Sequence, residues 1–213
     1  MSVKDSPDAN VSRETLALYE QILKDWQSRI NLVSASTLSD LCNRHFLDSL
    51  QLVPVIQSIT PAPAQAGVSF ETILTDLGSG AGFPGMVLAL SGIPNVHLIE
   101  SDQRKCAFLR EISRTCFDVS RETFRPTIHN DRIEKLNLKA DIITSRAFAD
   151  LNKTLEISEN LRHPDTLYLL LKPLDLQKEL TEAAQNWYFD HEIIPSISDV
   201  RGCILKISRV NKK

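Results

Sequence analysis

The chain has 213 residues, 42% of them hydrophobic and 24% charged, with a formal net charge of −3. These values are typical of a globular protein with one large domain, or one medium domain and a small extension. A net negative charge excludes nucleic-acid binding through a global positive field, so any such partner must meet a local basic patch. The apolar runs are shorter than the roughly 20 residues that a membrane-spanning helix needs.

The N-terminal residues MSVKDSPDAN lack the apolar segment of a secretory signal peptide. The four cysteines, Cys42, Cys106, Cys116 and Cys203, form neither a CxxC motif nor a zinc-like pairing with histidine. We therefore expect reduced and mostly packed thiols, no bound metal, no membrane association and a cytoplasmic protein.

Two amphipathic helices are predicted near the N-terminus. In the first, over 13–30, apolar residues recur at three- and four-residue steps behind Ser12, a plausible N-cap. The second runs from about residue 37 to 53 and should stop there, because a residue that precedes a proline, here Pro54, disfavours helical backbone. The basic tail Arg209–Lys213 is expected to be a frayed terminus.

The proline-containing segment I-T-P-A-P-A-Q-A-G predicts a linker and a change of organisation. We predict an N-terminal helical extension at 1–58, a linker at 59–69 and a larger domain at 70–213. In that domain, β-rich runs alternate with helical stretches, which predicts an α/β fold with a doubly wound, mostly parallel seven-stranded sheet. The last two strands are joined without a helix, so we expect an antiparallel strand at the sheet edge. The strand candidates are 71–77, 95–100, 124–129, 140–145, 165–171, 187–194 and 202–208, and the helix candidates are 84–91, 103–116, 149–161 and 174–186.

The most informative segment is D-L-G-S-G-A-G-F-P-G at Asp76–Gly85, which holds four of the seven glycines. It follows an apolar strand candidate and precedes a helix candidate. Glycine is favoured where the backbone needs a positive φ or where a ligand approaches closely. A strand, a glycine turn and a helix in this order predict a cradle for a nucleotide-like ligand.

Two cofactors fit this turn. Gly80, Gly82 and the last glycine of the run satisfy GxGxxG, and Glu100 follows at about the distance of an NAD fingerprint. Asp76 precedes Gly78 by two residues, however, and this register is typical of S-adenosylmethionine-dependent methyltransferases. A carboxylate there can hold the ammonium end of the cofactor's methionine moiety, whereas Glu100 suits the ribose of either cofactor. The pattern favours S-adenosylmethionine, with NAD as the alternative.

Besides the glycine turn, five blocks along the chain are informative: I-N-L-V-S at Ile30–Ser34, R-H-F-L-D-S at Arg44–Ser49, L-I-E-S at Leu98–Ser101, K-C-A-F-L-R at Lys105–Arg110 and S-R-A-F-A at Ser145–Ala149. Together with the turn, they resemble the RsmG (GidB) family of bacterial 16S rRNA guanine-N7 methyltransferases. The resemblance implies a class I, Rossmann-like methyltransferase fold with an N-terminal helical extension. It also implies methyl transfer from S-adenosylmethionine to N7 of guanine-527 in 16S rRNA, in the small ribosomal subunit or its assembly intermediate, by a monomeric enzyme.

The resemblance also implies cofactor contacts. Gly78 and Phe83 match positions that line the cofactor, and Glu100 matches the acidic residue on the ribose. Ile133 and Glu134 match the pair that flanks the adenine. Arg146, in the catalytic role, matches an arginine beside the methyl-transfer site, and it could orient a phosphate, the base O6 or the cofactor carboxylate.

Five residues are expected to contact the RNA: Arg44, Arg104, Lys105, Phe148 and Lys172. Phe148 can stack on a flipped base, or it can be a core aromatic residue. A solvated basic face is the default for Arg104 and Lys105. Pro173 follows Lys172 where the family usually has glycine, which leaves the role of Lys172 open.

Two residues of the second predicted helix have alternative roles. Arg44 can contact RNA, or it can pair with Asp48 at an i,i+4 spacing. His45 lies on the apolar face of that helix and is interpreted as a core histidine rather than a catalytic one.

The implied reaction needs no general base, because N7 of guanine carries an in-plane lone pair and no proton. Catalysis can then depend on proximity, alignment and electrostatics. The alternatives are an NAD-dependent oxidoreductase and a cofactor-binding ribosome-assembly factor.

Overall fold

The computed structural model describes residues 11–59, 69, 71–120 and 124–213. In these ranges seven strands form one sheet in the order β3-β2-β1-β4-β5-β7-β6, parallel from β3 to β5, with β7 antiparallel to both of its neighbours. The predicted doubly wound sheet with an antiparallel hairpin at one edge is therefore confirmed. The strands are β1 (Leu74–Leu77), β2 (Val96–Ile99), β3 (Thr127–His129), β4 (Ile142–Arg146), β5 (Leu167–Pro173), β6 (Trp187–Pro195) and β7 (Gly202–Lys212).

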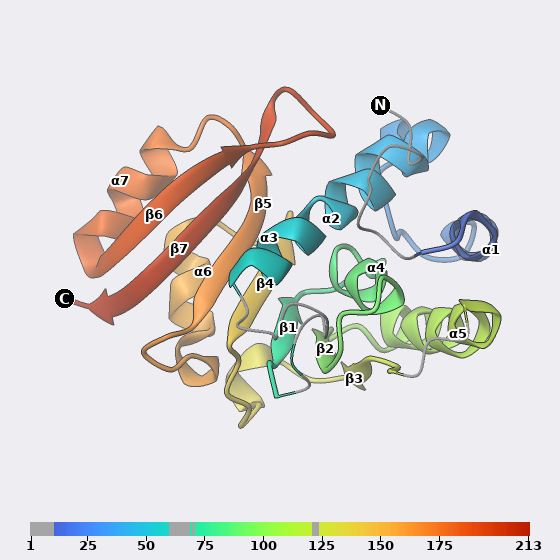
Figure 1. Ribbon diagram of the computed structural model, residues 1–213, viewed down its shortest axis with the longest axis horizontal. Helices are drawn as coiled ribbons and strands as arrows, with labels where there is room; N and C mark the ends of the chain where they lie inside the picture. The colour runs from blue at the N-terminus through green and yellow to red at the C-terminus, as the bar shows by residue number, and fades with distance from the viewer. Residues whose placement is uncertain (1–10, 60–68, 70, 121–123) are drawn as a thin grey trace.

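Helices precede the sheet and connect most of its strands (Figure 1). The first helix begins as predicted, because the Ser12 hydroxyl accepts a hydrogen bond from the Thr15 N–H at 3.1 Å. The helices are α1 (Arg13–Gln27), η2 (Ala35–Asp40), η3 (Cys42–Leu47), α2 (Asp48–Leu50), α3 (Leu52–Ile59), α4 (Gly85–Leu90), α5 (Gln103–Ser120), η4 (Ile133–Lys135), α6 (Leu151–Ile157), η5 (Glu159–Leu161) and α7 (Gln177–Asn186).

Each face of the sheet has its own hydrophobic core. Residues Leu169 and Leu171 of β5 pack with α4, α5 and the N-terminal helices, and Tyr168 and Leu170 pack with α6 and α7 on the opposite face. This alternation follows from the two-residue period of a strand. Figure 1 shows the N-terminal helices, in blue and cyan, beside α4 and α5. The core of the first face is thus shared between the N-terminal helices and the sheet domain.

The second predicted helix differs from the structure. Instead of one helix ending before Pro54, there is a 3-10 turn, the π-helical segment η3 and two short α-helices that continue to Ile59. Pro54 is the third residue of α3. The N–H groups of the first residues of a helix have no partner within that helix, so a proline, which lacks this group, is accepted there. The predicted linker at 59–69 lies outside the described residues except for its two ends.

The predicted frayed tail is wrong. β7 continues to Lys212, which pairs in register with Trp187 of β6. Arg209 forms an ion pair with Asp190, and the Lys212 ammonium lies 5.6 Å from the centroid of the Trp187 indole. Strand pairing and side-chain contacts to β6 hold the basic residues in place. None of the helices in the described part of the chain is long and apolar enough to cross a membrane.

Candidate active site

The glycine turn after β1 needs glycine for two reasons. Gly78, Gly80 and Gly82 have φ angles of +62°, +54° and +84°, in the left-handed region that other residues enter at a cost. A Cβ added to Gly78 would also lie 2.4 Å from Cδ2 of Phe148, and one added to Gly82 would lie 2.2 Å from the Tyr19 hydroxyl. Side chains are therefore packed directly against the backbone of the turn.

Asp76, near the end of β1, stabilises this turn through a hydrogen bond to its last residue, Gly85. Its side chain is fully buried, with Oδ1 accepting from the Thr144 hydroxyl at 3.2 Å and Oδ2 from the Gly85 N–H at 3.3 Å. Burial raises the pKa of this carboxyl to about 7, against the opposing effect of its hydrogen bonds. Asp76 connects the end of β1 to the start of α4 and does not line the cavity described below. Its contact with the cofactor's ammonium group stays a prediction.

Glu100, after β2, connects the turn to the neighbouring strand. Its Oε2 accepts from the Gly80 N–H at 3.0 Å and its Oε1 from the Asp102 N–H at 2.8 Å, and the residue is only 7% exposed. The carboxylate thus lies against the middle of the glycine turn, at the carboxyl edge of the sheet where doubly wound folds bind their ligands. The predicted ribose contact is not tested by this geometry.

One cavity of about 750 Å³ lies at the carboxyl edge of the parallel strands. The glycine turn forms one wall, the N-terminal extension a second, and the ends of β4 and β5 with the loop between β6 and β7 the remainder. Its lining includes seven of the predicted site residues, namely Gly78, Gly80, Phe83, Arg44, Lys105, Arg146 and Lys172. The structure therefore brings predicted cofactor residues and predicted RNA residues to one cavity.

Arg146, the last residue of β4, is held by the N-terminal extension. Its guanidinium donates to the Arg44 carbonyl at 2.9 Å, to Nδ1 of His45 at 2.6 Å and to Asp48 at 3.4 Å. It also lies 4.9 Å from the centroid of the Phe83 ring. Burial lowers the pKa of Arg146, and the Asp48 carboxylate opposes that shift. These contacts fix the direction of the guanidinium within the cavity.

His45 is buried, as predicted for a core histidine, and it also lines the cavity. Burial, then Arg146 and Arg44, lower its pKa to about 3. The ring is therefore neutral near pH 7. Because Nδ1 accepts from Arg146, Nε2 carries the proton and donates to the Thr37 hydroxyl, 2.8 Å away. Both ring nitrogens are engaged, so the ring positions Arg146 and offers no free base.

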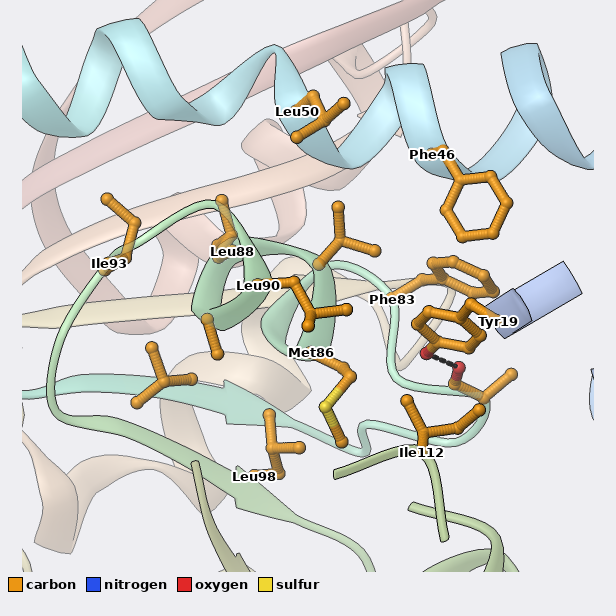
Figure 2. Packing of buried hydrophobic residues seen from close by; sticks show 14 of the residues in the cluster. Tyr19, Phe46, Leu50, Phe83, Met86, Leu88, Leu90, Ile93, Leu98 and Ile112 are labelled. Atoms are coloured by element: carbon orange, nitrogen blue, oxygen red, sulfur yellow. Dashed lines mark hydrogen bonds between the residues drawn. The ribbon is translucent and has the colours of Figure 1, made fainter. Parts of the chain in front are cut away.

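Phe83, in the glycine turn, is the centre of an aromatic cluster. Its ring is stacked on Tyr19 of α1 with centroids 5.5 Å apart and an angle of 9°, and it meets Phe46 edge-on at 5.5 Å. His45 is stacked on it at 4.9 Å. Figure 2 shows the Tyr19, Phe46 and Phe83 rings together beside α4. The N-terminal extension thus reaches the glycine turn directly.

The loop between β6 and β7 closes another side of the cavity. Asp199 forms an ion pair with Arg44, and the Ser198 hydroxyl donates to Asp48 at 2.7 Å. The Ile197 N–H donates to Gln51 at 3.0 Å. The alternative pairing of Arg44 with Asp48 is therefore wrong, since each has a partner from elsewhere in the chain. Sequence reasoning missed this loop because its partners are about 150 positions away in the chain.

The other predicted RNA residues are placed differently. Lys172 donates to the Ala149 carbonyl at 2.6 Å and pairs with Glu179 at 2.5 Å, so its ammonium already has two protein partners. Arg104 lies outside the cavity lining, and its side chain is 72% exposed. Phe148 is half-buried against Gly78, at the start of the turn.

The two predicted adenine-flanking residues lie in η4, after β3. Ile133 is 7% exposed and packs with the core of the second face, and Glu134 is exposed. Neither lines the cavity, and their contact with the adenine stays a prediction. Within the described ranges, no three His, Cys, Asp or Glu side chains lie close enough together to hold a metal ion.

Comparison with known proteins identifies relatives over nearly the whole chain. A model of the family GidB, rRNA small subunit methyltransferase G, matches residues 12–204. A ribosomal RNA small subunit methyltransferase G of Paramagnetospirillum magneticum is 43% identical, over 96% of this chain and 93% of the relative. One from Gluconobacter oxydans is 45% identical, over 93% and 95% respectively.

The fold is also shared with solved methyltransferase structures. The crystal structure of magnesium protoporphyrin IX methyltransferase from Synechocystis, with S-adenosylmethionine bound, aligns with a TM-score of 0.58. The alignment covers 90% of this chain and 97% of that one, at 12% sequence identity. The arrangement is therefore the Rossmann-like methyltransferase fold.

Proposed function

The chain belongs to the rRNA small subunit methyltransferase G family, and from this membership we propose that it transfers a methyl group from S-adenosylmethionine to N7 of guanine-527 in 16S rRNA. The substrate is the small ribosomal subunit or its assembly intermediate, and the enzyme acts in the cytoplasm as a monomer. Membership of a methyltransferase family does not favour the NAD-dependent oxidoreductase.

One observation carries the proposal: the glycine turn and the cationic residues Arg44 and Arg146 line the same cavity. A methyl donor on the turn and a base beside the arginines would therefore meet without a domain movement. Effective alignment of two reactants accounts for much of the rate enhancement of such transfers.

The turn fits the proposed cofactor. An added Cβ at Gly80 would meet only the Gly78 carbonyl, at 3.6 Å, so the space beside this glycine is open. Gly78, Gly80 and Phe83 would lie beside the methionine and ribose parts, and Asp76 and Glu100 keep the turn in shape. S-adenosylmethionine supplies an electrophilic methyl group when bound.

The protein's part in the proposed reaction is to position the guanine base and the methyl donor. N7 attacks through its own lone pair, so no proton has to be removed, and this suits a cavity in which His45 is neutral and bonded through both nitrogens. Arg146 would donate to guanine O6 or to a phosphate and so hold the base with N7 toward the methyl group. Arg44 and Lys105, at the cavity wall, would contact phosphates.

The decisive experiment maps 7-methylguanosine in small-subunit rRNA from cells with and without the gene. We expect the modification at guanine-527 to disappear on deletion and to return with the wild-type gene. An unchanged pattern would refute the proposal and favour a cofactor-binding assembly factor.

Calorimetric titration of the purified protein tests the cofactor separately. Saturable binding of S-adenosylmethionine without binding of NAD is expected. Binding of NAD alone would reverse the cofactor assignment.

A further inference from the structure

Tyr19 connects the N-terminal extension to the backbone of the glycine turn. It lies in α1, is fully buried, and its hydroxyl donates to the Ala81 carbonyl at 2.6 Å. Figure 2 shows this hydrogen bond as a dashed line beside the stacked rings of Tyr19 and Phe83. Donor and acceptor are 62 positions apart in the sequence.

The contacts of Tyr19 cover three consecutive residues of the turn. The hydroxyl binds Ala81, and it occupies the place that a Cβ of Gly82 would need, 2.2 Å away. The ring is stacked on Phe83. Ala81 and Phe83 both line the cavity, while Tyr19 itself does not. Tyr19 therefore contacts the side of the turn that faces away from the cavity, and it would not touch a ligand bound in the cavity.

A glycine-rich turn has many accessible conformations, because glycine enters both halves of φ space. Holding such a turn in one shape before a ligand arrives removes an ordering cost from binding. Asp76 and Glu100 already fix the two ends and the middle of the turn from within the sheet domain. Tyr19 supplies the corresponding contact for the segment between Gly80 and Phe83.

We propose that Tyr19 is a positioning residue for the cofactor, and that the N-terminal extension thereby forms part of the cofactor site. This inference rests on the proposed function, since it concerns binding of S-adenosylmethionine to the same turn. The extension then has two roles, because it also holds Arg146 through His45 and Asp48.

The test is Tyr19→Phe, which removes only the hydroxyl. Its matched control is Tyr168→Phe, since Tyr168 is also fully buried and its hydroxyl lies 2.8 Å from that of Ser158 on the opposite face of the sheet. Calorimetry with S-adenosylmethionine should give a dissociation constant about 5- to 20-fold higher for Tyr19→Phe, the loss expected for one buried hydrogen bond. Tyr168→Phe should lower the melting temperature and leave the dissociation constant unchanged.

Amide hydrogen exchange in the ligand-free protein gives a second readout. Tyr19→Phe should accelerate exchange at Gly80 and Gly82, and Tyr168→Phe should not. If neither the dissociation constant nor this exchange responds specifically to Tyr19→Phe, the proposal is overturned and Tyr19 is only a core residue. Failure of the wild-type protein to bind S-adenosylmethionine would instead contradict the proposed function, and the exchange experiment would still decide whether Tyr19 orders the turn.

Gly82→Ala tests the same contact from the side of the turn, should Tyr19→Phe fail to fold. Its Cβ would displace the Tyr19 hydroxyl and also lie 2.8 Å from Cβ of Met86. The control is Gly92→Ala, because Gly92 has a similar left-handed backbone but is exposed and outside the cavity lining. Gly82→Ala should weaken S-adenosylmethionine binding, and Gly92→Ala should leave it unchanged. Unchanged binding in Gly82→Ala would count against Tyr19.

Discussion

The two faces of the sheet contain the same kinds of buried pair, with different consequences. On the face of α6 and α7, the Arg162 guanidinium lies 4.6 Å from the Trp187 ring centroid and Tyr168 bonds Ser158. On the other face, Arg146 lies over Phe83 and Tyr19 bonds Ala81. The first set stays within its core. The second continues to the glycine turn and the cavity, so the position of these pairs, and not their chemistry, is the reason that we propose a functional role for them.

The largest effect is expected from Arg146→Ala. Losing the group that orients the base should reduce methyl transfer to small subunits by about 100-fold or more, the scale of misplacement effects in active sites. Arg162→Ala removes a similarly buried arginine from an aromatic ring and should leave the specific activity unchanged. Activity assays and melting curves of both variants make the comparison. A much larger fall in melting temperature for Arg146→Ala than for Arg162→Ala would make Arg146 a structural residue.

Gly78→Ala should follow in size. Both Gly78 and Gly80 have left-handed backbone, at which a Cβ costs about 1–2 kcal/mol. Only at Gly78 would the Cβ also collide with Phe148. We expect Gly78→Ala to raise the dissociation constant for S-adenosylmethionine at least about tenfold, since that collision adds to the backbone cost. A Cβ at Gly80 would enter the space assigned to the cofactor, so Gly80→Ala should weaken binding directly. Gly92→Ala, at an exposed left-handed glycine outside the cavity lining, is the control and should leave the dissociation constant unchanged. Near-wild-type affinity in Gly78→Ala would refute the placement of the cofactor on this turn.

Asp76 should make stability depend on pH. Its folded-state pKa is raised to about 7 from an ordinary value of 3.8, so the folded protein holds this proton more tightly than the unfolded chain. The contribution is fully present below about pH 4 and is lost as the pH rises through about 7. Asp76→Asn can keep both hydrogen bonds if its amide donates to the Thr144 hydroxyl. Its unfolding free energy, measured by denaturant titration between pH 5 and 8, should therefore decline less than that of the wild type, whereas parallel curves would contradict the assignment.

The smallest effect is expected at the edge of the sheet, outside the cavity lining. Arg209 and Asp190 form an ion pair with side chains 80% and 51% exposed, and such pairs contribute little. Arg209→Ala should leave the melting temperature almost unchanged and the methyltransferase activity unaltered. A clear loss of activity would show that the functional region extends beyond the cavity.

Much of the fold was predictable because its signals are local. Short β-rich runs between helical stretches predicted the strands, and the left-handed backbone of Gly78, Gly80 and Gly82 agrees with the glycine turn. Arg146 was predicted at the end of the fourth strand, and the structure places it there, in the cavity. Local propensity was sufficient for the strands and the turn, whereas the family resemblance indicated Arg146.

The contacts that complete the site were not predictable, since each joins distant segments. Nothing in the sequence near Arg44 indicates Asp199 as its partner, and Tyr19 has the spacing of an ordinary core residue of α1. The frayed tail was a wrong prediction for the same reason. Residues 209–212 have a polar local sequence, and strand pairing with β6 orders them.

The sheet order has a consequence for synthesis of the protein. β7 lies between β5 and β6, although it follows both in the chain. While the ribosome is still making Gly202–Lys212, β5 lacks its antiparallel neighbour and β6 has no place in the sheet. The parallel strands and their glycine turn can form earlier, but the loop that reaches Arg44 and Asp48 is closed only when β7 is added. Completion of the cavity therefore requires β7, the last strand of this sheet in chain order.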